Sequence, residues 1–364
     1  MSEKKICLLR ISSESKGRTM RVMEYTISDK KGLYEFEVEK IFNEKADAIE
    51  YSKENNVPLE LESKELIILE DAAEKPKTDE KKSKMQIIFV DWRVGRFIMF
   101  FMITAAVTYG LNGTWQEVLY AGAIGVLVAF TGFFLDYILD MEDDKKSGKL
   151  SNPIAKGTLN PIFAVVLIVT TLFASIILTI FTNDYVLIPI GILVVVIIFQ
   201  GVFNFMNTPI IRAITLGVLQ GLYVIMGALV AHNLKLSAGL MALYLFFAMT
   251  GGRAAGDTRD LPHDLKVDTM TLPKKYGPRG GAIFMLVNQF LAYGVGIGTY
   301  FTGIFKIGFL ICMIITAVIG TIMSIIFVIK PTPKVANIVN MLSLGILGKL
   351  FIVGLITGRM TPIV

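Results

Sequence analysis

The sequence predicts an all-α, multi-pass membrane protein with nine transmembrane helices around a central cavity, preceded by a small soluble α+β domain. Three observations support this fold class. Hydrophobic residues make up 53% of the 364 positions, and only 18% are charged. The apolar residues come in long blocks, and the mean hydropathy of the chain is +0.60. The first 90 or so residues differ from the rest because they carry about half of all the charged residues.

Residues 1–70 are predicted to form the soluble domain. The segments KICLLRI, MRVMEYTI and YEFEVEKIF have the composition of strands, and DKKG lies between the last two as a turn. KADAIEYSKENN is predicted to be a helix that ends at its Asn pair, and the extended stretch PLELESKELIILE follows it. Residues 71–90 are predicted to be a charged linker, because 71–84 contain almost no large apolar side chains.

Residues 91–364 are assigned to the membrane domain because they contain nine apolar blocks. Each block is near the ~20 residues that a helix needs to cross a bilayer. The blocks run over residues 95–112, 116–137, 161–182, 184–204, 210–231, 236–255, 280–301, 304–329 and 335–357.

The distribution of basic residues predicts the orientation of these blocks. The loops after the second, fourth, sixth and eighth blocks are rich in Lys and Arg, whereas the opposite side has mainly Lys235, Lys306 and Arg359. The positive-inside rule places the basic side in the cytoplasm. We therefore expect an integral protein of the cell membrane whose N-terminus faces the cytoplasm. The basic residues lie in short loops, so no nucleic-acid partner is expected.

Two clusters of aspartates follow apolar blocks on the predicted cytoplasmic side. The first contains Asp136, Asp140, Asp143 and Asp144, and the second contains Asp257, Asp260, Asp264 and Asp268. Carboxylates near membrane depth are costly unless a partner compensates their charge. Spacings of four place Asp136, Asp140 and Asp144 on one helical stripe, and Asp260 and Asp264 repeat that geometry. Two facing stripes would form an oxygen-rich cage for Mg²⁺, which usually completes its shell with substrate phosphates.

This arrangement indicates an enzyme that acts on a lipid diphosphate. Mg²⁺ held by the carboxylates would neutralise the departing diphosphate. Aromatic side chains within one turn of Asp136 would protect the cation-like prenyl group, namely Phe133, Phe134 and Tyr137. Basic side chains at the rim of the cage would bind the diphosphate, namely Lys145, Lys146, Arg253, Arg259 and Lys266.

Residues 90–360 resemble the UbiA superfamily of intramembrane prenyltransferases in both motifs and in the nine-helix count. The first family motif has the form N-D-x-x-D-x-x-x-D followed by R-P-x-x-x-G, and this chain has DYILDMEDD at 136–144 and NPIAKG at 152–157. The second has the form D-x-x-D-x-x-x-D-x-x-x-G-x-x-T-L-P, and this chain has DTRDLPHDLKVDTMTLP at 257–273.

The resemblance implies a set of site residues. The catalytic residues, which are also the Mg²⁺ ligands, would be Asp136, Asp140, Asp144, Asp260 and Asp264. Asp257 and Arg212 would bind the diphosphate. The chain departs from the pattern in several places: Asp136 replaces the usual Asn, Tyr137 replaces an Asp, Asn152 replaces an Arg, and Asp268 replaces a Gly.

The expected reaction is Mg²⁺-dependent transfer of a prenyl group from a polyprenyl diphosphate, such as geranylgeranyl diphosphate, to a lipophilic acceptor in the membrane. The acceptor is either an aromatic quinone precursor or geranylgeranylglyceryl phosphate in ether-lipid synthesis. The alternative is a cation-coupled transporter whose path the acids would line; acids clustered at one face favour the enzyme. Residues 1–70 are a candidate site for a protein partner.

Overall fold

The computed structural model describes residues 3–11, 19–28, 36–42, 50, 54, 59–67, 94–147, 152–202, 208–265, 267 and 269–359. The chain divides into two compact units, Met1–Lys82 and Ser83–Val364. The described strands lie in the first unit, and the long helices lie in the second.

The first unit contains a four-stranded sheet in the order β3-β1-β2-β4. Its strands are β1 Glu3–Ile11, β2 Thr19–Ser28, β3 Phe36–Phe42 and β4 Leu59–Ile67. β1 pairs antiparallel with β2 and with β3, and β2 pairs in parallel with β4. The four strands lie in the four segments that the sequence predicts to be extended. Of the predicted helix before β4, only Glu50 and Glu54 lie among the described residues, and both are helical.

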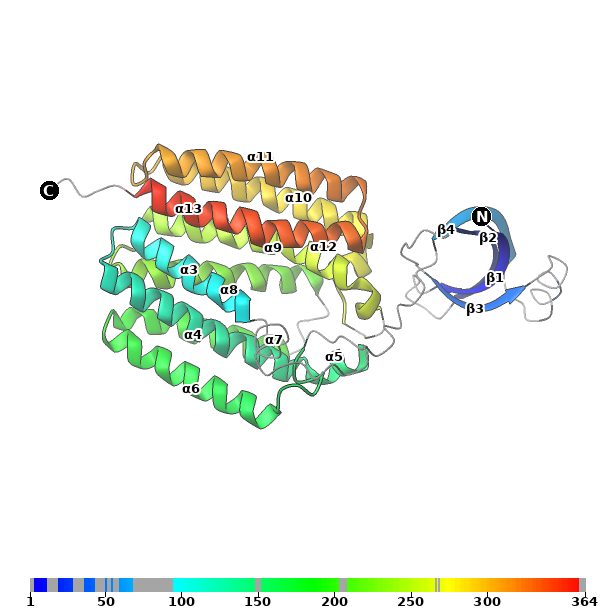
Figure 1. Ribbon diagram of the computed structural model, residues 1–364, viewed down its shortest axis with the longest axis horizontal. Coiled ribbons are helices and arrows are strands. Elements are labelled where there is room, and N and C mark those ends of the chain that lie inside the picture. Colours follow the sequence, from blue (N-terminus) through cyan, green and yellow to red (C-terminus); the bar gives the residue numbers. More distant parts are fainter. Residues whose placement is uncertain are drawn as a thin grey trace. The chain divides into compact units, whose positions relative to one another are not determined.

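The second unit is a bundle of helices that run side by side (Figure 1). In chain order its main helices are α3 Val94–Gly110, α4 Trp115–Leu139, α5 Met141–Ser147, α6 Pro161–Ile180, α7 Leu187–Val202, α8 Pro209–Val230, α9 Leu236–Asp264, α10 Leu272–Tyr300, α11 Ile307–Ile329, α12 Pro333–Leu342 and α13 Gly348–Gly358. A 3-10 turn, η2 Asp184–Val186, precedes α7. A π-helical segment, η4 Ser343–Leu347, joins α12 to α13.

Seven helical segments of the described chain are long and apolar enough to cross a membrane. They are α4, α6, α8, α9, α10, α11 and the continuous run from α12 to α13. The first and fourth predicted blocks correspond to shorter apolar helices, Phe97–Gly110 and Asp184–Phe199. Among the described residues, helices thus occupy all nine predicted blocks, but seven of them have the length and composition that spanning requires, so the predicted nine transmembrane helices are not confirmed.

N-cap residues define the starts of several of these helices. Thr114 and Glu117 form a reciprocal capping box at the start of α4, where the Glu117 N–H donates to Thr114 Oγ1 and the Thr114 N–H donates to Glu117 Oε2. Asn160 caps α6, and Pro161 occupies its first position. Thr332 and Pro333 repeat this arrangement at α12.

The bundle is closed: α3 packs on α4, α8 and α13, and α9 packs on α8, α10 and α12. Close approach of α8 and α9 depends on Gly217, because a Cβ there would overlap Thr250 Oγ1 and lie 2.5 Å from the Phe246 carbonyl oxygen. These contacts place the start of α8 beside the second half of α9. Arg212 and Arg253 lie in those two places.

The helices that carry the two acidic motifs end differently. α4 stops at Leu139, and Asp140 caps it before α5 begins at Met141, so the first predicted stripe is divided between two helices. The backbone N–H of Asp140 still donates to Asp136 O, and that of Asp144 to Asp140 O, both at 2.9 Å. By contrast, α9 continues past the apolar block without a break to Asp264. After it, α10 is kinked at Gly277, whose φ of 74° is readily adopted only by glycine.

Candidate functional site

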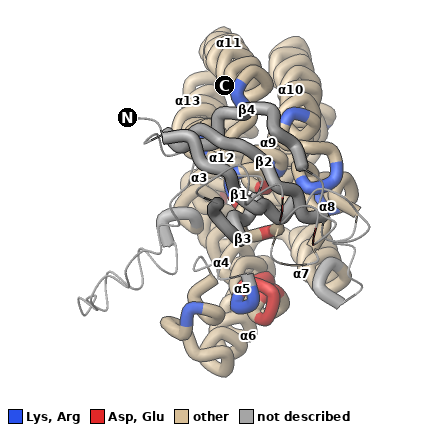
Figure 2. Tube along the Cα trace, turned by 90° about the vertical axis from the view of Figure 1, so that its right-hand side faces the viewer, with Lys and Arg blue, Asp and Glu red and all other residues tan. Residues whose placement is uncertain are grey.

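The first motif lies at the junction of α4 and α5. Asp136 is exposed, and Asp140 and Asp144 are partly buried. Asp143 is exposed, and so are Lys145 and Lys146 in the last turn of α5. Figure 2 shows acidic and basic residues together on this short helix. Acids in its first turn and lysines in its last turn complement the helix dipole, which stabilises α5 despite its shortness.

Asn152 holds the loop after α5 against the end of α4. Its side-chain NH2 donates to the backbone oxygen of Tyr137 at 2.8 Å and to Asp144 Oδ2 at 3.1 Å. Its Oδ1 accepts the backbone N–H groups of Ile154 at 3.0 Å and Ala155 at 3.3 Å. Asn152 is only 1% exposed. A candidate ligand, Asp144, is therefore restrained by a buried amide whose own hydrogen bonds are satisfied.

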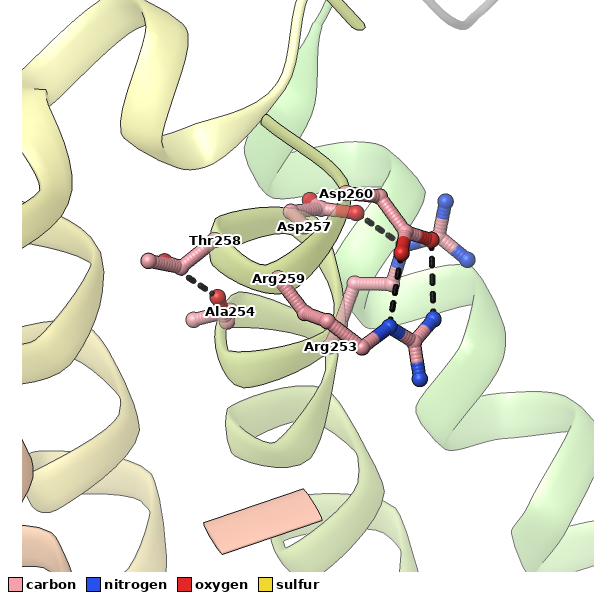
Figure 3. Close-up of polar contacts among 6 residues, drawn as sticks. All are labelled: Arg253, Ala254, Asp257, Thr258, Arg259 and Asp260. Atoms are coloured by element: carbon pink, nitrogen blue, oxygen red, sulfur yellow. Dashed lines mark hydrogen bonds and ion pairs between the residues drawn. The ribbon is translucent and has the colours of Figure 1, made fainter. Parts of the chain in front are cut away.

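The second motif pairs its acids with arginines on the same helix. Arg253 Nε lies 2.8 Å from Asp257 Oδ1, one helical turn away, and the Asp257 side chain is 5% exposed. This contact lacks the alignment of a hydrogen bond, so its attraction is mainly ionic. Arg259 donates two hydrogen bonds to Asp260, from Nε to Oδ1 at 2.6 Å and from Nη2 to Oδ2 at 2.8 Å. Figure 3 shows both pairs on one side of α9, with Thr258 on the other.

The two motifs and two arginines from α8 and α9 share one electrostatic environment. The charge of Asp136 interacts with those of Asp140, Asp144, Arg212 and Arg253. Arg212 in turn interacts with Arg253, Asp140, and with Asp257 and Asp264 of the second motif. The fold therefore brings the predicted residues of α4, α8 and α9 together, although the two acidic motifs are more than 100 positions apart in the sequence.

Three charged atoms in this environment are buried without a hydrogen-bond partner among the described residues, namely Arg212 Nη1, Arg253 Nε and Asp257 Oδ2. Arg253 Nε has its ionic contact with Asp257 Oδ1, which leaves Arg212 Nη1 and Asp257 Oδ2. An unpaired buried charge is costly, so such atoms are expected where a ligand completes the site. One atom is cationic and suits a phosphate oxygen, and the other is anionic and suits a metal ion.

The predicted oxygen cage is not assembled from the described residues. Among them, no three His, Cys, Asp or Glu side chains gather closely enough to hold a metal ion. Arginines contact Asp257 and Asp260 instead. These ion pairs occupy oxygens of Asp257, which the sequence analysis assigns to diphosphate binding, and of Asp260, which it assigns to metal binding.

The remaining predicted residues divide into three groups. Tyr137 is buried in a core cluster with Phe134, Ile154, Leu159 and Ala164, and its ring meets that of Phe134 edge-on at 6.0 Å. Lys145 and Lys146 are exposed on α5. Lys266 and Asp268 lie outside the described residues.

Lys274 has a structural role that the sequence analysis does not predict. Its Nζ donates to three backbone oxygens of the segment that joins α9 to α10: Asp264 at 3.3 Å, Val267 at 2.6 Å and Thr269 at 3.3 Å. An ammonium at a helix C-terminus also compensates the partial negative charge there. The only signal in the sequence is a lysine directly after the T-L-P of the second motif.

Comparison with known families gives a match over residues 97–345, to the family described as the UbiA prenyltransferase family. This segment contains both acidic motifs, Arg212 and Lys274. A search of curated proteins finds no match.

Solved structures with this fold include a synthase and two UbiA homologues. A digeranylgeranylglyceryl phosphate synthase matches with 22% identity and a TM-score of 0.58, covering 75% of this chain and 98% of that chain. A UbiA homologue from Aeropyrum pernix K1 in the apo state matches with 16% identity and a TM-score of 0.55, covering 73% and 94%. A UbiA homologue from Archaeoglobus fulgidus, bound to DMAPP and Mg²⁺, matches with 14% identity and a TM-score of 0.56, covering 75% and 99%.

Proposed function

Since this chain belongs to the UbiA prenyltransferase family, whose members transfer prenyl groups, we propose that it moves a prenyl group from a polyprenyl diphosphate to a membrane-associated acceptor in a Mg²⁺-dependent reaction. The seven long apolar helices and the family membership make it an integral membrane protein. We further propose that the two shorter apolar helices also span the bilayer, which gives nine spans.

The observation that carries this proposal is the meeting of both acidic motifs with Arg212 and Arg253. The carboxylates outnumber the arginines, so the site has an excess of negative charge that a bare diphosphate would not tolerate. Divalent cations would reverse this repulsion. A site that holds cations and a diphosphate together accounts for both buried atoms without partners, Asp257 Oδ2 and Arg212 Nη1.

The candidate ligands for Mg²⁺ are Asp136, Asp140 and Asp144 on one side and Asp260 and Asp264 on the other. Carboxylate oxygens are the ligands that Mg²⁺ prefers. When bound, Mg²⁺ would neutralise charge on the departing diphosphate. Because the Asp260 carboxylate contacts Arg259 in this structure, ligand binding would require that pair to rearrange.

The arginines have a separate task in this proposal. Arg212 has a buried Nη1 atom without a hydrogen-bond partner among the described residues, its charge interacts with acids of both motifs, and a guanidinium donor suits a phosphate oxygen. Arg253 is held in place by Asp257, so its charge lies near the first motif before substrate arrives. Such preorganised charges stabilise the charge that develops on the leaving group.

The acceptor belongs to one of two classes, an aromatic quinone precursor or geranylgeranylglyceryl phosphate. The likeness to a digeranylgeranylglyceryl phosphate synthase extends to the fold, and it makes the second class worth testing first. We also propose that the site opens toward the cytoplasm of the cell membrane, because the basic loops lie at the same end of the bundle. The N-terminal unit is proposed to bind a protein partner.

The test is transfer from radiolabelled geranylgeranyl diphosphate by the full chain in detergent micelles, with Mg²⁺ or with EDTA, against a panel of phenolic and glycerol-phosphate acceptors. A labelled lipid product that depends on Mg²⁺ supports the proposal, and the acceptor that yields it identifies the class. Release of diphosphate without a product supports the donor site and rejects the acceptor panel. Absence of both with every donor length contradicts the proposed reaction.

A further inference from the structure

Asn152 belongs to the first motif's loop but stands where the resembled pattern has an arginine. Its side chain, however, is hydrogen-bonded to neighbouring parts of the protein. Both hydrogens of its amide are donated, one to the Tyr137 carbonyl and one to Asp144 Oδ2, and its oxygen accepts two backbone N–H groups. The orientation of the amide follows from these partners, because two of them only donate and two only accept.

The two ends of this side chain perform different tasks. Oδ1 closes a turn by accepting the N–H groups of Ile154 and Ala155. Nδ2 joins that turn to the end of α4 and to a carboxylate of α5. A residue that only shaped the loop would need the first set of contacts and not the second.

The surroundings make this link rigid. Ile154 and Leu159 are 5% and 3% exposed and pack against Phe134 and Tyr137 of α4. The turn itself is closed by further backbone hydrogen bonds, from Lys156 N to Asn152 O at 3.0 Å and from Thr158 N to Pro153 O at 2.9 Å. The Asn152 amide therefore has little rotational freedom, and Asp144 Oδ2, to which it donates, is also restrained.

We propose that Asn152 is a positioning residue that orients the Asp144 carboxylate for a divalent cation. This inference rests on the proposed function in one respect, that Asp144 is a metal ligand. A hydrogen bond to one oxygen of a carboxylate restrains the plane of the group, and so the direction from which a cation can approach it. Groups that hold ligands in this way commonly change metal affinity on the order of 10–100-fold when they are replaced.

The chain contains a matched control for the loop-shaping task. Asn160 also precedes a proline, and its Oδ1 also accepts the N–H two residues on, from Ile162 at 2.8 Å. Asn160 is exposed and caps α6, where its side chain accepts a hydrogen bond from the backbone. Asn152→Ser and Asn160→Ser each leave a hydroxyl that can accept a turn hydrogen bond, but only the first removes a donor to a carboxylate.

The experiment titrates Mn²⁺ into the full-length chain in detergent with inorganic pyrophosphate present, and follows binding by the loss of free Mn²⁺ signal in electron paramagnetic resonance. Asn152→Ser is expected to weaken Mn²⁺ binding on the order of 10-fold or more, whereas Asn160→Ser is expected to bind like wild type. Thermal unfolding of both variants is measured in parallel. In an Asp144→Asn background, Asn152→Ser is expected to have no further effect on binding.

Equal Mn²⁺ affinities for the two serine variants would overturn the inference, and so would a wild-type chain that binds no Mn²⁺. If Asn152→Ser does not fold, Asn152→Asp replaces it, because it keeps the shape and the Oδ1 acceptor. The second oxygen of its carboxylate replaces Nδ2 and would lie against Asp144 Oδ2. An unshifted Mn²⁺ midpoint in that variant would therefore also overturn the inference. The proposed function fails separately, if wild type binds Mn²⁺ and pyrophosphate but transfers no prenyl group.

Discussion

The two acidic motifs interact with the same arginines but are held by different means. The first is interrupted at Asp140, and a buried amide from a later turn restrains Asp144. The second lies on one unbroken helix, where arginines contact Asp257 and Asp260. A hydrogen bond from a neutral amide leaves the charge of a carboxylate unchanged, whereas an ion pair partly cancels it. Under the proposed function, the second motif would therefore have to exchange an arginine contact for a cation.

The strongest test of this comparison replaces one acid in each motif. Asp140→Asn and Asp264→Asn are each expected to lower kcat/KM for the prenyl diphosphate by at least about 10²–10³-fold, because each removes charge that a cation requires. The exposed Asp143 provides the control, and Asp143→Asn is expected to stay within about twofold of wild type. Initial rates with labelled donor measure all three. Full activity in either motif variant would mean that only one motif serves the reaction.

The arginine pairs of the second motif should differ in their effect on stability. Arg253→Met leaves the almost buried Asp257 carboxylate without its cation, and we expect a loss of roughly 3 kcal/mol. Arg259→Met breaks a more accessible pair and should cost about 1 kcal/mol or less. Thermal unfolding in detergent measures both. An equal loss from the two variants would show that burial does not distinguish the pairs.

Lys274 tests whether the end of the second motif also depends on a restraint from a later residue, as the first depends on Asn152. Lys274→Met removes the donor to three backbone oxygens and is expected to destabilise the protein by about 1–3 kcal/mol. The neighbouring Lys275 is exposed and lies over the ring of Tyr276, so Lys275→Met should have a smaller effect. Hydrogen exchange in the segment between α9 and α10 should rise only in Lys274→Met. Unchanged hydrogen exchange in this segment would show that the Lys274 ammonium does not restrain it.

The smallest effect is expected from removing the N-terminal unit. Deleting residues 1–82 takes away one compact unit and leaves the whole of the family match at 97–345. Both acidic motifs remain, so kcat and KM should change by less than about threefold. Steady-state rates of purified full-length and shortened chains measure this. A large loss would show that the sheet contributes to the reaction rather than only to a partner.

The sequence predicts the helices well where lipid contact determines them. α11 begins at Ile307 and ends at Ile329, close to the apolar block at 304–329, because uninterrupted apolar side chains mark the membrane-embedded length. The sixth block is less informative, since it ends at 255 whereas α9 continues to Asp264. Hydropathy reports where apolar residues stop, not where backbone hydrogen bonds stop.

The site is predictable in its charges but not in its restraints. The acids and Arg212 can be found from spacing and from the family motifs. The contacts of Asn152 with Tyr137 and Asp144, and those of Lys274 with backbone oxygens, cannot be found in this way. They join a side chain to groups that only the folded loop brings near, and the sequence carries no period or composition that marks them.

The length of α9 has a consequence for how a lipid substrate would lie. Its 29 residues extend about 43 Å, which exceeds the ~30 Å hydrocarbon layer of a bilayer. The apolar block at 236–255 is itself about 30 Å long, so in an α9 that spans the bilayer the last turns, with Asp260 and Asp264, would project to the depth of the lipid headgroups. A prenyl diphosphate bound there would keep its phosphates among polar groups and its hydrocarbon chain among hydrocarbon. The substrate could diffuse in from the leaflet without first being lifted into water, so the solubility of long isoprenoids would not limit its capture.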